Sequence, residues 1–507
     1  MLLLAVGVFA AGAVGVEWRE SLWGYSAPAR FTGDIANALA QGDRVLDDAG
    51  GAGDGTGASW AELFRAYVAR YDKVRDLTPE GQNADLDYPP GRLLIATLWA
   101  RQTRLEFGPG GYEDRRAGFM LRINYALEAA AAVAILLFVR SVLIASGKTK
   151  LVALTWACVS AVLFWLNPAL LINAHAWPQW DVWLVPFYVL AAWCVYMRWG
   201  LAAGALLVVG SLLKGQLLIV SALMLLWPIF RGDWRTALGV AAGFLAMTAA
   251  LMSPWLVASG WATSIWIATT VATLIVTLAA AWFLRRKVGP TVVASIGLLI
   301  MALAVLLIGP RTGGSMNWLT IGFPTTRYPY MALGPLHNLP AILAETWRWR
   351  VGSPVELLGV VAPLRSWMQW LFFGSLAVSA IGLAWSSRRR STHVIVGVVA
   401  PWVMLFAVMP QMHERYMTWG AVLSAMLVAV RPAYVLVYIC LTTQAVAMML
   451  STQLPSAGQR DMVWPEVWSF SQKLGPFAGY TTMTLAVVLL AASFPGPKSE
   501  PDTPKPV

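Results

Sequence analysis

The chain has 507 residues, of which 58% are hydrophobic and only 12% are charged, and its mean hydropathy is +0.62. A soluble protein of this length cannot hide so much apolar surface, so the composition excludes an ordinary soluble enzyme. The repeated apolar runs predict an all-α polytopic membrane protein. The net charge of +11 comes from short clusters between these runs, so it does not indicate a nucleic-acid partner.

The apolar runs predict a bundle of about 12–14 transmembrane helices. The first run could be a signal peptide, but it lacks a preceding Lys or Arg, which favours its retention as a span. The three cysteines, Cys158, Cys194 and Cys440, lie far apart inside runs, as packing residues do. The runs are 2–17, 119–144, 150–165, 180–198, 200–213, 216–230, 236–254, 261–284, 290–308, 366–385, 393–409, 416–430, 432–450 and 476–493.

Basic clusters assign the two sides of the expected membrane. "GKTK" (147–150), "RWG" (198–200), "RGDWR" (231–235), "RRK" (285–287) and "SSRRRS" (386–391) all fall on one side, which the positive-inside rule assigns to the cytoplasm. We therefore expect a membrane module over 1–430, further transmembrane helices over 431–493 and a disordered cytoplasmic tail over 494–507. The first extracytoplasmic loop then spans 18–118.

That first loop is long and is expected to carry amphipathic helices. "FTGDIANALAQG" predicts a helix start, where Asp34 is either a helix cap or a functional carboxylate. "DDAGGAGDGTGAS" (47–59) predicts a mobile tether. In "LDYPP" (86–90) the two prolines fix an extended turn before a further helix, where Asp87 either only orients the turn or is held beside a groove.

Polar residues also stand at the outer ends of apolar runs. In "NAHAWPQWD" (173–181), His175 and Gln179 stand near Asp181, and a His close to an Asp could suggest a metal site. One His with scattered carboxylates is a weak metal pattern, however, and hydrogen bonding at a helix end is the commoner role. Glu128 and Arg122 are expected to satisfy each other or neighbouring helices. Residues 200–230 must form a short hairpin with Lys214 at its tip, either snorkelling to the interface or facing an anion.

"PQMHERY" (410–416) places three charged or titratable residues together. His413 and Arg415 could hold a phosphate, since Arg offers two parallel N–H groups, while Glu414 could instead neutralise Arg415. With the topology above, every unusual polar residue falls on the extracytoplasmic face. These residues are Asp34, Asp85, Asp87, His175, Gln179, Asp181, Lys214, Arg327, His413, Glu414 and Arg415.

The order of "GD", "LDYPP", "NAHAWPQWD", "KGQ" and "HERY" resembles the GT-C glycosyltransferases, above all the endoplasmic-reticulum glucosyltransferases that extend lipid-linked oligosaccharide. The chain departs from that family in keeping one histidine of "HGHFQ" and in having "HER" for "HEK". The resemblance implies an inverting transfer of a hexose, glucose or mannose, from a polyprenyl-phosphate carrier, without a cofactor or metal. It implies Asp34 as general base, a donor-phosphate site of Lys214, His413 and Arg415, and a substrate groove of Asp87, Tyr88, His175 and Gln179, to which we add Arg327.

The expected partners are a polyprenyl-phosphate-linked sugar, a glycan or lipid-linked acceptor, and membrane lipids. The style of the sequence suggests a bacterial plasma membrane, with the site facing the exterior. Two other classes remain open. A transporter or flippase of a lipid-linked sugar would suit intramembrane charges, and a membrane scaffold would need no convergence of polar residues.

Overall fold

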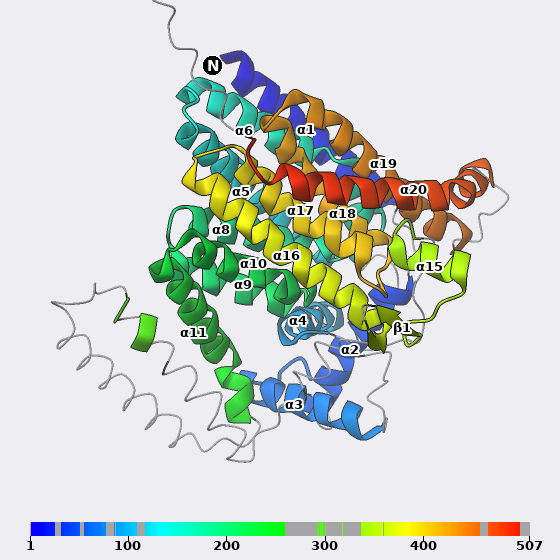
Figure 1. Ribbon diagram of the computed structural model, residues 1–507. Coiled ribbons are helices and arrows are strands. Elements are labelled where there is room, and N and C mark those ends of the chain that lie inside the picture. Colours follow the sequence, from blue (N-terminus) through cyan, green and yellow to red (C-terminus); the bar gives the residue numbers. More distant parts are fainter. Residues whose placement is uncertain are drawn as a thin grey trace, which may run out of the picture.

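The fold is taken from a computed structural model that describes residues 2–25, 32–50, 55–77, 86, 88–108, 117–258, 292–293, 295–297, 300, 317, 336–357, 359–456 and 465–496. The chain is mostly helical, as predicted. Figure 1 shows a bundle of helices with α2, α3 and α4 gathered at its lower end. A disordered tail was predicted over 494–507, and the residues from 497 onward lie outside the described part of the chain.

The first loop carries helices, as predicted. α1 (Leu2–Tyr25) is followed by α2 (Thr32–Gly50), α3 (Trp60–Leu77) and α4 (Pro90–Phe107). The tether prediction is wrong at its start, because α2 continues to Gly50. The acidic residues of that segment are held by basic partners: Arg104 contacts Asp47 at 2.7 Å, and Lys73 contacts Asp48 at 2.5 Å.

The main bundle contains the remaining helices and one small hairpin. They are α5 (Gly118–Ala145), α6 (Lys150–Trp165), α7 (Pro168–Leu171), η2 (Ile172–Ala176), η3 (Asp181–Leu184), α8 (Val185–Tyr196), α9 (Gly200–Leu213), α10 (Gln216–Arg231), α11 (Trp234–Ala258), α15 (Leu339–Trp347), β1 (Pro354–Leu357), β2 (Val360–Pro363), α16 (Leu364–Arg388), α17 (His393–Val408), η5 (Glu414–Tyr416), α18 (Met417–Leu423), η6 (Ser424–Ala429), η7 (Pro432–Tyr434), α19 (Val435–Ser456) and α20 (Pro465–Ala492).

Every apolar run predicted outside 261–308 is helical in the structure. Most of 261–308 lies outside the described residues. Within the described residues, five helical segments are long and apolar enough to cross a membrane, which is consistent with a membrane protein. They are Gly118–Ala145, Lys150–Ala176, Trp234–Trp255, Leu364–Arg388 and Pro432–Ser451, and five shorter apolar helices accompany them.

The centre of the bundle is a buried helical hairpin. In α17 every residue from Val394 to Val408 is buried, and so is every residue of α18 and η6. α16 and α20 both pack on α17. The "PQMHERY" segment connects the two arms of this hairpin, and all of its residues are buried except Gln411 and His413, which are partly exposed. Enclosure is what permits non-helical backbone at membrane depth.

Glycines allow α9 and α11 to approach closely. Gly200 and Gly204 on α9 face Gly239 and Gly243 on α11, so each helix carries a GxxxG pattern. A Cβ added at Gly204 would overlap the Val240 carbonyl oxygen. Since α9 ends directly before Lys214, this packing fixes the position of the Lys214 turn.

The two ends of the bundle differ in chemistry. At one end, which we call the arginine end, Arg388 Nη2 donates to the Phe230 carbonyl at 2.8 Å, and Arg198 Nε lies 3.5 Å from Asp233. α10, which runs from Gln216 to Arg231, also reaches this end with its last residue. The turns that carry Asp181, Lys214 and His413 lie at the opposite end, which we call the site end.

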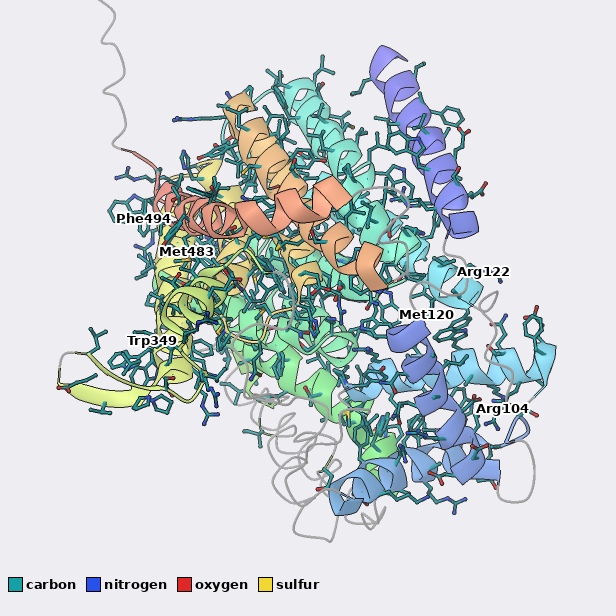
Figure 2. The ribbon with its side chains drawn as sticks, turned by 90° about the vertical axis from the view of Figure 1, so that its right-hand side faces the viewer. Arg104, Met120, Arg122, Trp349, Met483 and Phe494 are labelled. Carbon is teal, nitrogen blue, oxygen red and sulfur yellow. The ribbon has the colours of Figure 1, made fainter. Side chains whose placement is uncertain are left out.

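The part of the chain that the structure describes contains one element that the all-helical prediction missed. β1 and β2 pair antiparallel, with Leu357 opposite Val360, between α15 and α16. The segment "VELLGVVA" is rich in β-branched residues and contains Gly359 at φ 77°, which suits a tight turn. Figure 2 shows this hairpin on the opposite side of the molecule from Arg104.

The glycine packing can be tested with two alanine substitutions. Gly204→Ala should lower the melting temperature in detergent, because its Cβ meets the α11 backbone, and overpacking costs about 1–3 kcal/mol. Gly374→Ala is the matched control in α16, where an added Cβ has no neighbour within 4 Å. Equal melting temperatures for the two variants would contradict the close packing.

Candidate functional site

A fully buried carboxylate, Asp181, lies at the centre of the candidate site. Its Oδ1 is 2.5 Å from Lys214 Nζ, and its Oδ2 is 3.5 Å from Arg415 Nε. Asn173 Nδ2 also donates to Oδ2 at 3.1 Å. Residues predicted from two distant runs, Lys214 and Arg415, are therefore brought together. The third predicted phosphate ligand, His413, is two residues away from Arg415 and is about one-third exposed, with its ring 5.4 Å from Tyr416.

Three interruptions of helical backbone create this meeting point. The π-helical turn η2 ends at Ala176, and non-helical residues follow until η3 begins at Asp181. α9 stops where Lys214 adopts an extended conformation at φ −144° and ψ 107°. α17 stops at Val408, followed by Met409 in extended backbone and Pro410. Each break ends a helix early and leaves at least one charged side chain inside the bundle: Asp181 at the first, Lys214 at the second, and Glu414 with Arg415 at the third.

A third cation, Arg92, joins the cluster from the first loop. Its Cζ lies 3.7 Å from the Tyr88 ring and 3.5 Å from the Trp180 ring, so the guanidinium contacts both rings in the corner between them, where the two ring planes are inclined by 69°. Its charge is also felt by Lys214. A Cβ at Gly91 would come within 2.8 Å of the Leu212 carbonyl, which shows how closely the start of α4 approaches the end of α9.

Aromatic rings enclose the cations. Tyr416 and Trp419 stack at 4.6 Å between ring centroids, and Lys214 Nζ lies 4.9 Å from the Tyr416 centroid. Trp419 Nε1 donates to the Asp181 carbonyl at 2.9 Å, and Arg415 Cζ lies 5.3 Å from the Trp177 ring. These rings attract the cations and keep water away from them, which strengthens every electrostatic contact in the site.

The site carries excess positive charge among the described residues. Lys214 and Arg415 contact one buried carboxylate, Asp181, with Arg92 close to Lys214, and a second buried carboxylate, Glu414, directly precedes Arg415 in the chain. Burial lowers the pKa of the Lys214 ammonium to about 8, although the Asp181 carboxylate acts in the opposite direction. The neighbouring charges of Arg92 and Arg415 also contribute to this lower pKa. Lys214 is thus still mostly charged at pH 7, and the cluster suits an anion.

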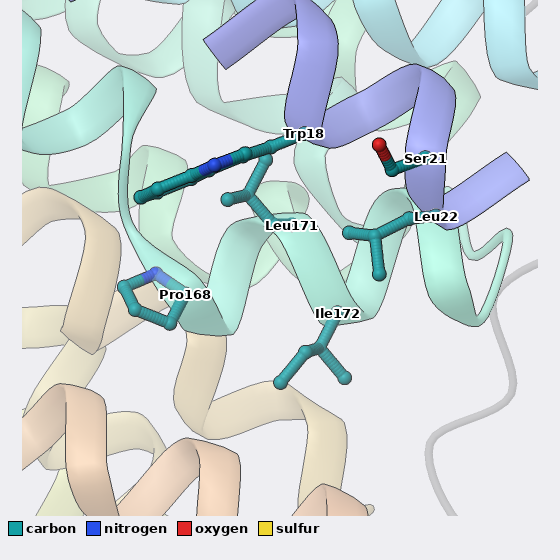
Figure 3. Close-up of a pocket in the computed structure, with 6 residues that line it drawn as sticks. All are labelled: Trp18, Ser21, Leu22, Pro168, Leu171 and Ile172. Atoms are coloured by element: carbon teal, nitrogen blue, oxygen red, sulfur yellow. The ribbon is translucent and has the colours of Figure 1, made fainter. Parts of the chain in front are cut away.

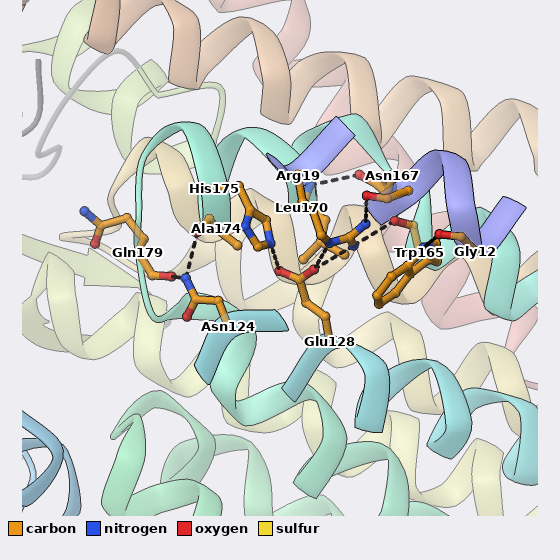
Figure 4. A network of polar contacts seen from close by, with 11 residues as sticks. Gly12, Arg19, Asn124, Glu128, Trp165, Asn167, Leu170, Ala174, His175 and Gln179 are labelled. Carbon is orange, nitrogen blue, oxygen red and sulfur yellow. Dashed lines mark hydrogen bonds and ion pairs between the residues drawn. The ribbon is translucent and has the colours of Figure 1, made fainter. Parts of the chain in front are cut away.

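A second buried network stands beside this cluster (Figure 4). The Glu128 carboxylate lies 2.6 Å from the Arg19 guanidinium and 2.9 Å from His175 Nε2, and all three side chains are fully buried. Arg19 also donates to the Trp165 carbonyl at 2.9 Å. Glu128 is therefore satisfied by neighbouring helices, as one expectation allowed, whereas Arg122 is exposed.

His175 and Gln179 hold the turn that carries Asp181. Both are fully buried, so neither faces an open groove in this structure. Asn124 Nδ2 donates to the Gln179 carbonyl at 3.0 Å and to the Ala174 carbonyl at 2.7 Å, while its Oδ1 accepts from Trp183 Nε1 at 2.6 Å. One asparagine of α5 thereby clamps both sides of the helix interruption.

Three predicted site residues have no described side chain. Asp87 and Arg327 lie outside the described residues, and Asp34 is described only as part of helix α2. The packing of α2 still bears on its position. Gly42 touches α4 at Ala96, and beyond this crossing Asp43 and Asp47 both reach Arg104. The N-terminal parts of the two helices, which begin near Asp34 in α2 and at Pro90 in α4, therefore lie together on the other side of the crossing.

An apolar pocket of about 290 Å³ opens between α1 and the segment 168–172 (Figure 3). Its wall includes Trp18 and Leu22 from α1, and Leu171 and Ile172 from the opposite side. Ile172 directly precedes Asn173, which bonds Asp181. Consecutive residues of the η2 turn therefore contact the pocket and the charged cluster.

Sequence reasoning missed several members of the site. Asp181 was noted as a polar residue of the outer face, but not as the partner of Lys214. Arg92 follows the two prolines, yet no sequence pattern pairs it with residue 214. The described residues contain no group of three or more His, Cys, Asp or Glu side chains arranged to hold a metal ion.

The Glu128 network predicts a stability effect. Glu128→Gln leaves the Arg19 charge buried without a carboxylate, which should cost about 3–5 kcal/mol and lower the melting temperature in detergent. Adding Arg19→Met to Glu128→Gln should recover much of that loss, because the buried charge is then removed as well. Additive losses in the double variant would show that the two residues do not stabilise each other.

Comparison of the sequence with protein-family models and with curated proteins gives no match. No relative therefore supplies an activity for this chain. The charge, burial and geometry of the cluster around Asp181 carry the functional inference.

Proposed function

We propose that this protein is an inverting glycosyltransferase. It would move a hexose from a polyprenyl-phosphate carrier to a glycan or lipid-linked acceptor at the extracytoplasmic side of a membrane. The observation that carries the proposal is the cluster of Lys214, Arg415 and Arg92 around Asp181, at the meeting point of three helix breaks. Its excess positive charge supports binding of a phosphate group.

The chemistry requires that charge. As the bond between the anomeric carbon and the phosphate oxygen breaks, the electron pair moves to that oxygen, and polyprenyl phosphate departs with one more negative charge. Cations already in position stabilise this growing charge without reorganising. Lys214 provides a compact ammonium, while the planar guanidinium of Arg415 can donate two parallel N–H groups.

The acceptor needs a base on the opposite face of the sugar. In the proposed step the Asp34 carboxylate takes the proton of the acceptor hydroxyl while the acceptor oxygen forms a new bond to the anomeric carbon. The packing of α2 on α4 supports this role. The N-terminal parts of the two helices, which begin near Asp34 and at Pro90, lie on the same side of the point where the helices cross. Arg92 and Tyr88 stand near the start of α4.

The lipid carrier fits the depth of the cluster. α9 has 14 residues and so measures ~21 Å, whereas the hydrocarbon core of a bilayer is about 30 Å thick. If α9 begins at the membrane surface of the arginine end, Lys214 stands below the opposite surface. A phosphate on a membrane-embedded isoprenoid can reach such a position, and the apolar pocket beside Ile172 offers room for part of its chain.

The arginine end supports the proposed orientation. Arg198, Arg231 and Arg388 gather there, and the positive-inside rule assigns such an end to the cytoplasm. The site end would then face the exterior. Transport of a lipid-linked sugar is distinguished from transfer by its products, because only transfer releases polyprenyl phosphate and forms a new glycosidic bond.

The base assignment is tested by Asp34→Asn in a reconstituted assay with synthetic polyprenyl-phosphate sugars. The variant should lose turnover and still bind donor, because an amide cannot accept the hydroxyl proton. Asp48→Asn on the same helix is the matched control, since it removes only an exposed pair with Lys73. Turnover by Asp34→Asn equal to that of the control would remove Asp34 from the mechanism.

The cation assignment predicts a charge-dependent loss. Lys214→Gln or Arg415→Gln should each lower kcat by about 10²–10³-fold, by analogy with loss of one preorganised donor. Arg235→Gln, on an exposed residue of the arginine end, should have no effect. Donor binding should also weaken as the pH rises above 8, because the Lys214 ammonium then loses its charge. That alkaline loss should disappear in Lys214→Arg, and its persistence there would assign it to another group.

A further inference from the structure

The β1–β2 hairpin presents an apolar tip at the surface. Leu357, Val360 and Val361 are 51%, 48% and 65% exposed. Turns of hairpins in water usually carry polar residues such as Asn or Asp, but this turn reads Leu-Leu-Gly-Val. An isolated two-stranded hairpin is marginally stable in water, and exposed apolar strands with unpaired edges invite aggregation. The tip is therefore poorly suited to an aqueous loop.

The base of the hairpin is firmly attached to the bundle. Val355 packs on a small core that includes Leu343 and Met368. Trp367 Nε1 donates to the Val355 carbonyl at 3.0 Å. The chain thus holds the two strands rigidly and projects their tip, which distinguishes the hairpin from a loop that is apolar by accident.

The hairpin is continuous with a surface suited to lipid. α16 begins at Leu364, directly after β2, and is one of the five helices long enough to cross a membrane. Its first turns expose Trp370, Leu371 and Phe373, each about half exposed. Because α16 ends at the arginine end with Arg388, the hairpin lies at the site end of this helix.

Basic residues flank the apolar tip. Arg348 and Arg350 are exposed before β1, and Arg365 follows β2, against the single acidic residue Glu356 within the hairpin. Trp349 stands between the first two arginines, and Figure 2 shows it near the base of the hairpin. Tryptophan and arginine beside an apolar segment are characteristic of the headgroup region, where arginine can bind lipid phosphates.

We infer that the hairpin tip inserts into the membrane leaflet at the site end, with its arginines on anionic lipid headgroups. Insertion is shallow, since strand edges with unpaired backbone groups do not occur in the hydrocarbon core. The tip therefore rests at the boundary between headgroups and acyl chains. The inference depends on α16 crossing the membrane and not on glycosyl transfer.

The test uses a fluorophore at the tip. Val361→Cys is labelled with an environment-sensitive dye after Cys158, Cys194 and Cys440 are replaced by Ala, and the protein is placed in nanodiscs that contain phosphatidylglycerol. Ile381→Cys on α16 is the lipid-exposed control, and Gly57→Cys between α2 and α3 is the water-exposed control. Quenching is measured with nitroxide on the acyl chain near the headgroup, and separately with aqueous iodide.

Insertion predicts that residue 361 is quenched by the lipid nitroxide as strongly as residue 381 and is protected from iodide. Adding Leu357→Asp should expose the label at 361 to iodide while leaving residue 381 unchanged, because the charge opposes entry of the tip. The inference is overturned if residue 361 behaves like residue 57. It is equally overturned if Leu357→Asp changes neither form of quenching.

Discussion

The buried charge of Asp181 is the constraint on which the rest of this structure depends. An ionised carboxylate inside an apolar bundle costs several kcal/mol unless cations and hydrogen bonds surround it. Lys214 and Arg415 supply these cations from two other helix breaks. The ion pairs of Asp181 therefore join three places where the chain stops being helical. With Arg92 beside them, the cations exceed what the described carboxylates can neutralise, and this excess makes the cluster suitable for a phosphate.

Different kinds of contact hold the three helix breaks in position relative to one another. Glycine contacts between α9 and α11 set the height of Lys214, and Asn124 clamps the backbone on both sides of the break before Asp181. The Arg19–Glu128–His175 network ties α1 and α5 to the same turn. The central hairpin supplies Arg415 from a mostly buried segment. Rigid surroundings of this kind are what an electrostatic catalyst needs, because its charges must be in place before the reaction begins.

The sequence was sufficient for much of the helical bundle because long apolar runs leave few alternatives to a helix. Lys214 and Arg415 could be singled out because charged residues between apolar runs are expensive to place. The contacts between distant residues were harder to predict from the sequence. Arg19 and Glu128 are 109 positions apart, and Arg92 has no local pattern that links it to Lys214. The β1–β2 hairpin was missed because it lies between the predicted runs 290–308 and 366–385, and its turn has no polar pair such as Asn-Gly to indicate a hairpin. The roles of Asp34, Asp87 and Arg327 remain predictions from the sequence.

The central claim is that the cations around Asp181 hold the phosphate of a lipid-linked sugar. Cryo-electron microscopy of the protein with a non-hydrolysable polyprenyl-phosphate hexose tests it most directly. We predict phosphate density within hydrogen-bonding distance of Lys214 and Arg415, with the sugar on the side from which α2 enters. Phosphate density at another part of the molecule, with Lys214 and Arg415 still closed on Asp181, would contradict the account.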